Sequence, residues 1–147
     1  MNTTPGLSPQ QIAESAAQEM WRQDRTSQGL GLKLEKIGPG TATLTMDVSE
    51  AMSNGHGNCH GGYVFTLADC AFSFASNSRG QKGVGHHCII TYIRPGRIKD
   101  RLTAIATEVS RVGRSGIYDV RVVNQDGEHI AEFRGFSRML AGSTGSD

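Results

Sequence analysis

The first patterned segment of the chain has the spacing of an amphipathic helix. Apolar residues recur there at steps of three and four, at Ile12, Ala13, Ala16, Ala17, Met20 and Trp21. Ser8 can cap the start of this helix, Pro9 suits its first position, and Gln11 can complete a capping box. We therefore expect a helix that begins after Ser8 and ends near Arg25.

Two strand-like segments follow this helix. Residues 33–37 predict a short strand, and Gly38-Pro39-Gly40 predicts a turn. In residues 41–48 Ala, Leu, Met and Val alternate with Thr and Asp, which is typical of a half-buried strand. The stretch 49–59 is rich in Ser, Asn and Gly and is expected to be a loop.

The segment from His60 to Asn77 is apolar almost all round, which indicates a buried helix rather than a surface one. One narrow stripe along it is polar, formed by Thr66, Asp69, Ser73 and then Ser76 or Asn77. The pair Arg79-Gly80 is expected to end the helix. Such a helix must be covered by other elements on most of its surface.

The remaining chain predicts four strands, at about 84–94, 101–112, 115–124 and 128–139. Turn signals separate them at Pro95-Gly96, Gly113 and Asp126-Gly127, and the short spacings suggest antiparallel neighbours. An antiparallel sheet of about six strands, curved around one central helix with an extra N-terminal helix, is the simplest α+β arrangement. We expect residues 1–147 to form a single domain with flexible ends at 1–7 and 141–147.

Composition excludes several classes of protein. The 147 residues carry a formal net charge of +1, which argues against a nucleic-acid binder. No apolar run approaches the roughly 18 residues that span a bilayer, and the first ten residues lack the features of a signal peptide. Cys59, Cys70 and Cys88 are odd in number and lack zinc-type spacing, so we expect neither disulfides nor a metal site. The cytoplasm is the expected location.

Asp69 is the one charged residue between His60 and Arg79. A carboxylate in an apolar helix is costly unless it is paired or hydrogen-bonded. It could be a structural group bonded to Thr66 or Ser73, or a catalytic base or nucleophile whose pKa is raised by burial. Its surroundings favour catalysis.

Those surroundings are the residues His60-Gly61-Gly62 at the start of the helix. Consecutive glycines are poor helix formers, but they allow a ligand to approach the backbone closely. The first amides of a helix lack internal partners and can stabilise a developing oxyanion. A plain loop-to-helix turn is the alternative explanation.

Gly61 and Asp69 are eight residues apart, which is about 12 Å along a helix. They cannot both reach one reacting carbon from the same helix. If they cooperate, they must come from two chains, so the catalytic hypothesis predicts a symmetric dimer with two equivalent sites.

Several segments together resemble hotdog-fold acyl-CoA thioesterases of the phenylacetic-acid-degradation (PaaI) type. They include Asn54-Gly55-His56, Cys59-His60-Gly61-Gly62, Leu67-Ala68-Asp69 and Asn77-Ser78, and later Tyr92-Ile93-Arg94-Pro95-Gly96 and Gly116-Ile117-Tyr118-Asp119-Val120. The resemblance implies a helix wrapped by a curved sheet, and dimers that associate into a tetramer. It also implies hydrolysis of phenylacetyl- or hydroxyphenylacetyl-CoA without a metal or redox cofactor, CoA being part of the substrate.

By matching position, Gly61 supplies the backbone amide for the thioester carbonyl and Asp69 of the partner chain supplies the carboxylate. Asn54 and His60 take supporting positions. Relatives often place a Ser or Thr early in the next strand, where this chain has Gly85-His86-His87-Cys88, so His86 is the candidate water-orienting group.

The remaining substrate contacts are expected to bind the CoA phosphates, which arginine suits. They are Arg94, Arg111, Gly113 and Arg114, with Gly62 beside the carbonyl site. Scattered surface charge is the alternative for each arginine taken singly. Cys59 is interpreted as structural rather than as a thiol nucleophile.

Three other functions compete with a thioesterase. A non-catalytic acyl-CoA or acyl-carrier binding module would need no carboxylate on the apolar helix. Hotdog hydratases and dehydratases place an Asp and a His around an Asn-Pro pair, and no Asn-Pro occurs here. A structural dimerisation domain would leave both the glycine pair and Asp69 unexplained.

Overall fold

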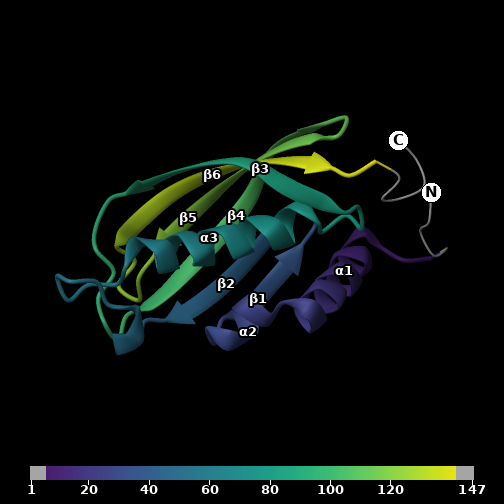
Figure 1. The fold of residues 1–147 in the computed structure, drawn as a ribbon. Coiled ribbons are helices and arrows are strands. Elements are labelled where there is room, and N and C mark those ends of the chain that lie inside the picture. The colour runs from purple at the N-terminus through teal and green to yellow at the C-terminus, as the bar shows by residue number, and fades with distance from the viewer. Residues whose placement is uncertain (1–5, 142–147) are drawn as a thin grey trace.

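A curved antiparallel sheet wraps around one long helix in the computed structural model, which describes residues 6–141 (Figure 1). The helices are α1 (Pro9–Gln23), α2 (Arg25–Gly29) and α3 (Gly61–Ser76), with a short 3-10 turn at Glu50–Met52. The strands are β1 (Lys33–Gly38), β2 (Thr41–Asp47), β3 (Gly83–Tyr92), β4 (Arg101–Val112), β5 (Ser115–Val123) and β6 (His129–Met139). This is the predicted hotdog architecture.

The strand order is β1-β2-β4-β5-β6-β3, and all neighbours are antiparallel. The sequence suggested that the last four strands pair in chain order, which is wrong for β3: it pairs with β6 and not with β4. Residues 93–100 make this crossing possible, because their length exceeds three strand spacings of about 4.8 Å. The crossing leaves β3 at one edge of the sheet.

The core lies between α3 and the concave face of the sheet. Phe72 of α3 is buried against the rings of Tyr118 and Phe133, at centroid distances of 5.8 Å in both cases. Two glycines make room for it, since a Cβ built at Gly85 or Gly135 would lie 2.6 or 2.8 Å from the Phe72 ring. These close approaches hold α3 against β3 and β6.

The N-terminal helices cover the side of the sheet at β1. The predicted capping box is present: Ser8 Oγ accepts from the Gln11 amide at 3.1 Å, and the Ser8 amide donates to Gln11 Oε1 at 2.9 Å. The helix ends at Gln23 because Asp24 caps a new helix, α2, by accepting from the Ser27 amide at 2.9 Å. The sequence analysis did not predict α2.

The predicted flexible ends, 1–7 and 141–147, fall largely outside the described residues, so that expectation stays a prediction. Between residues 6 and 141, no helix has both the length and the apolar character needed to cross a bilayer.

Candidate active site

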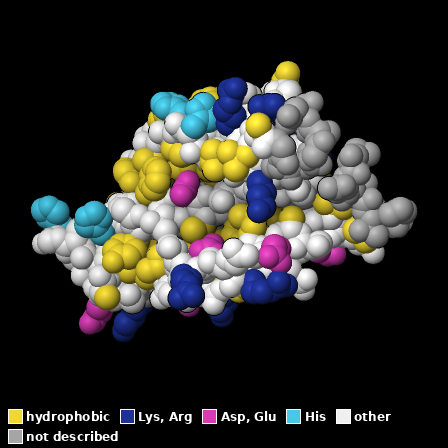
Figure 2. Space-filling view, turned by 45° about the vertical axis from the view of Figure 1, so that its right-hand side comes forward, with side chains coloured by type: hydrophobic (Ala, Val, Ile, Leu, Met, Phe, Trp, Pro, Cys, Tyr) yellow, Lys and Arg dark blue, Asp and Glu magenta, His cyan; other side chains and the backbone are white. Residues whose placement is uncertain are grey.

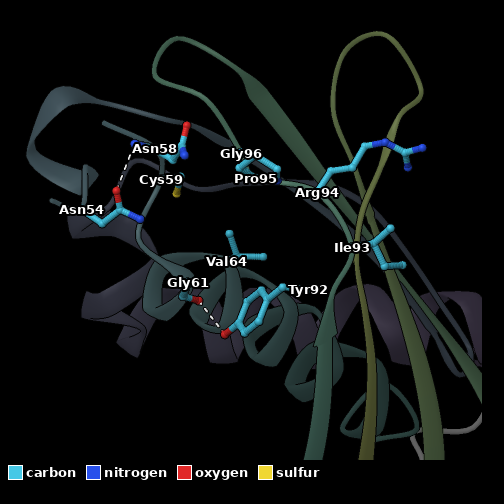
Figure 3. Close-up of a pocket in the computed structure, with 10 residues that line it drawn as sticks. All are labelled: Asn54, Asn58, Cys59, Gly61, Val64, Tyr92, Ile93, Arg94, Pro95 and Gly96. Atoms are coloured by element: carbon cyan, nitrogen blue, oxygen red, sulfur yellow. Dashed lines mark hydrogen bonds between the residues drawn. The ribbon is translucent and has the colours of Figure 1, made fainter. Parts of the chain in front are cut away.

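A pocket of about 400 Å³ opens at the N-terminal end of α3 (Figure 3). The loop before α3 supplies its polar wall, and the end of β3 supplies much of its apolar wall. Its lining includes Asn54, Cys59, Gly61, Val64, Tyr92 and Pro95. The pocket therefore brings together the predicted site residues Asn54 and Gly61.

The Gly61 amide is the unpartnered donor in this region. The neighbouring amides are all used: Cys59 donates to the Gly96 carbonyl at 2.8 Å, and His60 donates to the Met52 carbonyl at 2.7 Å. Tyr63 donates to the His60 carbonyl at 3.0 Å. Within the described residues the Gly61 N–H has no acceptor. A free amide at a helix N-terminus, where the dipole is positive, is suited to a partial negative charge on a ligand.

His60 caps α3 with its ring. Its Nδ1 accepts from the Gly62 amide at 2.9 Å, so this nitrogen carries no proton in the structure. The Gly62 N–H is consumed by this bond, so Gly62 is not available as a second donor to a substrate. His60 thus fits a supporting position, and Gly62 does not act through its amide.

Asn54 organises the loop that forms the polar wall. Its Oδ1 accepts from the amides of His56 and Asn58, at 2.9 and 3.1 Å. Its side-chain NH₂ makes no hydrogen bond with any described residue and points into the pocket (Figure 3). Asn54 can therefore offer a second donor to the pocket that Gly61 also lines.

Asp69 is half-buried on α3, and burial raises the pKa of its carboxyl group. The structural alternative is not supported, because Thr66 Oγ1 donates to the Gly62 carbonyl at 2.9 Å rather than to Asp69. Ser73 makes no side-chain bond to it either, and no described residue donates to its carboxylate. A desolvated carboxylate with open lone pairs is suited to act as a base or nucleophile.

The catalytic candidates on α3 lie apart within one chain. Eight residues separate Gly61 from Asp69 in one continuous helix, a rise of about 12 Å. Asp69 lies instead beside the middle of β3, where its charge adds to burial in raising the pKa of the Cys88 thiol. One protomer therefore holds the amide and the carboxylate at separate positions.

The two histidines of β3 lie at a β-bulge between Gly85 and His87. The simple alternation expected for a regular strand is broken here, as is typical where a strand re-aims a side chain. The His87 ring packs on Phe136 with a centroid distance of 5.2 Å, while His86 is exposed at the sheet edge. His86 lies near the start of β3 and away from the pocket, which is at the other end of that strand.

The predicted phosphate-binding residues do not gather in one protomer. Arg94 follows the end of β3 and donates to the His129 carbonyl at 3.4 Å. Arg111, Gly113 and Arg114 form the hairpin between β4 and β5, at the opposite end of the sheet. The ten residues of β3 separate these ends by about 30 Å.

The cysteine thiols and the possible metal ligands are the last group of candidate residues. Burial, and secondarily the charge of Asp100, raises the pKa of Cys59 to about 11, so its thiol is protonated at neutral pH. All three cysteines are free. Among residues 6–141 no group of three His, Cys, Asp or Glu side chains could hold a metal ion.

The sequence analysis used Tyr92 only as part of the family resemblance and gave it no role in the site. Its hydroxyl donates to the Gly61 carbonyl at 2.9 Å, and its ring lines the pocket (Figure 3). An aromatic residue at a strand end carries no signal of this contact, because its partner lies 31 residues away in the chain.

Known proteins resemble this chain in both sequence and fold. The profile of the thioesterase superfamily matches residues 56–131. The acyl-coenzyme A thioesterase PaaI of Escherichia coli is 40% identical over 127 residues, which cover 86% of this chain and 91% of that protein.

Solved structures agree with these matches. The E. coli PaaI protein from the phenylacetic acid degradation operon superimposes with a TM-score of 0.90 at 39% identity, covering 92% of this chain and 99% of that one. A mutant of the phenylacetic acid degradation protein PaaI from Thermus thermophilus gives 0.77 at 38% identity, covering 80% and 100%. A hypothetical thioesterase protein from Streptococcus pneumoniae, solved with coenzyme A, gives 0.72 at 29%, covering 74% and 88%.

The family match includes the end of the loop before α3 and all of α3 and β3, and so the residues that line the pocket except Asn54. The chain therefore belongs to the thioesterase superfamily, with the hotdog fold and with acyl-CoA thioesterases of the PaaI type among its relatives.

Proposed function

We propose that this protein hydrolyses aryl-acetyl-CoA thioesters, phenylacetyl-CoA or hydroxyphenylacetyl-CoA, to the free acid and CoA within phenylacetic acid degradation. The observation that carries the proposal is the unpartnered amide of Gly61, a residue that lines the pocket at the N-terminus of α3. Similarity to PaaI supports the choice of an acyl-CoA thioester as the substrate.

In the proposed reaction the Gly61 N–H binds the thioester carbonyl oxygen. Negative charge develops on that oxygen as the carbonyl carbon is attacked, and a fixed amide dipole stabilises it. The side-chain NH₂ of Asn54 supports the same oxygen from the loop, while His60 holds the first turn of α3 in place. The metal-free chemistry uses no cofactor beyond the CoA of the substrate.

Asp69 provides the carboxylate in either of two routes. As a nucleophile, its oxygen bonds to the carbonyl carbon, the C–S bond breaks, CoA leaves as the thiolate, and water hydrolyses the resulting anhydride. As a general base, it takes a proton from water, and the hydroxide adds to the carbonyl before CoA leaves. The open lone pairs and raised pKa of Asp69 support both routes.

The site is completed in a dimer. β3 is an edge strand with one unpaired side, and it carries exposed hydrophobic residues at Val84, Ile89 and Tyr92. Exposed hydrophobic side chains also gather on the face shown in Figure 2. A long apolar edge strand is a template for pairing with another chain. Antiparallel pairing of two β3 strands would place Gly61 of one α3 beside Asp69 of the partner subunit.

The same pairing accounts for the separated arginines. When two β3 strands pair antiparallel about a twofold axis, Arg94 of one protomer would approach the β4–β5 hairpin of the other. That hairpin carries Arg111, Gly113 and Arg114. The CoA phosphates would bind there, and His86 would reach the carboxylate site to orient water. We propose that two such dimers form a tetramer, and that the enzyme works in the cytoplasm, where free thiols such as these persist.

The proposal is tested by thiol release from phenylacetyl-CoA. We expect turnover by the wild type and a loss of about 10²–10⁴-fold in kcat for Asp69→Asn. Asp126→Asn in the exposed β5–β6 turn is the matched control and should keep wild-type activity. Near-full activity of Asp69→Asn would end the assigned role of this carboxylate. A folded wild type that binds CoA but cleaves neither aryl nor short acyl thioesters would instead be a binding module.

A further inference from the structure

Tyr92 at the end of β3 contacts the first residue of α3 through its side chain. Its hydroxyl donates to the Gly61 carbonyl at 2.9 Å, and a Cβ built at Gly61 would lie 3.1 Å from the Tyr92 Cζ. The ring therefore packs directly on the glycine that lines the pocket and has an unpartnered amide. The absence of a side chain at Gly61 is explained in part by this contact, and not only by the approach of a ligand.

The backbone of Tyr92 is held by its pairing with β6, so its side chain reaches Gly61 from a fixed position. Tyr92 is in register with Ala131 of β6. The two amides that follow, of Ile93 and Arg94, both donate to the Ile130 carbonyl, at 2.8 and 3.2 Å. The side chain thus extends from the sheet to the helix start from a rigid base, although it is itself half-exposed.

The bonds around Gly61 fix both of its peptide planes. The peptide plane before Gly61 is held through the His60 carbonyl, which accepts from the Tyr63 amide at 3.0 Å. The plane after it is held at both ends: the Gly62 N–H donates to His60 Nδ1 at 2.9 Å, and the Gly61 carbonyl accepts from Tyr92. Two adjacent glycines would otherwise leave this turn conformationally free. An oxyanion donor is effective only when it is held in place before the reaction.

We propose that Tyr92 is a positioning residue that holds the Gly61 amide in its oxyanion-binding orientation, an inference that rests on the proposed thioesterase function. The residue acts through the Gly61–Gly62 peptide and not on the reacting atoms. Because the alignment matters most when charge develops on the carbonyl oxygen, the hydroxyl contributes to kcat and not to KM.

The test is the substitution Tyr92→Phe, which keeps the ring in the pocket wall and removes only the hydroxyl. We expect kcat for phenylacetyl-CoA to fall about fivefold, the worth of one net hydrogen bond, with KM unchanged. Tyr118→Phe is the matched control, because the Tyr118 hydroxyl also donates over 2.9 Å, to Glu108 and away from the pocket. It should lower the melting temperature and leave kcat unchanged.

A double-variant cycle distinguishes positioning from general stability. Gly61→Pro removes the N–H at a helical position that tolerates proline. In that background Tyr92→Phe should have no further effect on kcat, because there is no donor left to align. An unchanged kcat in Tyr92→Phe, an equal loss in Tyr118→Phe, or a full fivefold loss in the Gly61→Pro background would each overturn the inference alone. A wild type without thioesterase activity would overturn the proposed function and this inference together.

Discussion

Asp69 is the residue whose chemistry depends most on its surroundings. Its carboxylate lies on a largely apolar helix, no described residue donates to it, and burial raises its pKa. The charged form is thus disfavoured in the folded protein relative to a solvated aspartate. Such a group is costly for stability, and a role in the reaction is the explanation that we favour.

The raised pKa of Asp69 predicts the acid limb of the pH–rate profile. Either route requires the ionised carboxylate, so kcat/KM should rise with pH through a value above the ordinary Asp pKa of about 3.9. The acid limb is measured with phenylacetyl-CoA at saturating and subsaturating concentrations. A limb at or below the ordinary value would contradict the proposed desolvation of this group.

The raised pKa of Asp69 also predicts how the stability of the folded protein changes with pH. Because the folded-state pKa is raised, the stabilising contribution of the neutral carboxyl is fully present below the unfolded-state pKa and is lost as pH rises through the folded-state pKa. Asp69→Asn lacks this titration. The melting temperature of the wild type should therefore fall relative to that variant across this interval.

At the scale of elements, α3 is a helix whose start is held mainly by side chains. The His60 ring caps it, and the loop before it is arranged by the Asx bonds of Asn54. The glycine pair contributes little helix propensity of its own. The alignment of the free Gly61 amide thus depends on the cap and on the contact with β3.

The cap is tested by a pair of substitutions at His60. His60→Ala should cost about 1 kcal/mol of unfolding free energy and lower kcat, because an N-cap acceptor is lost. His60→Asn supplies a good N-cap side chain and should restore most of the stability. Chemical denaturation and thiol release measure the two effects. If Asn were as destabilising as Ala, the ring would have a role other than capping.

At the scale of the whole molecule, the groups proposed to take part in the reaction lie apart within one protomer. The Gly61 amide and the Asp69 carboxylate are held on one rigid helix, and Arg94 lies at the opposite end of the sheet from Arg111 and Arg114. In the proposed dimer, an antiparallel copy of β3 at its unpaired edge brings both sets together.

The shared site is tested by complementation. Gly61→Pro and Asp69→Asn should each lose most of the wild-type activity, yet co-refolding equal amounts should recover about a quarter of it. Half of randomly formed dimers are mixed, and each of those has one intact site of two. Gly61→Ala, which keeps the N–H, controls for the added Cβ. No recovery in a mixture shown to form mixed dimers would place both groups in one chain.

The sequence by itself determined the elements and the main candidates of the site. Helical and alternating periodicity identified α1, α3 and all six strands, because each pattern is local. Asp69 and Gly61 were evident from a charge in an apolar helix and from glycines at its start. The capping of α2 by Asp24 was missed, since a five-residue helix carries no periodic signal.

Only the tertiary structure decided what depends on contacts between distant segments. Periodicity says which face of a strand is buried, but not which strand lies beside it, so the pairing of β3 with β6 had to come from the structure. The contact between Tyr92 and Gly61 and the bulge before His87 are of the same kind. Each is a hydrogen bond or a register between segments far apart in the chain, where no local pattern records the partner.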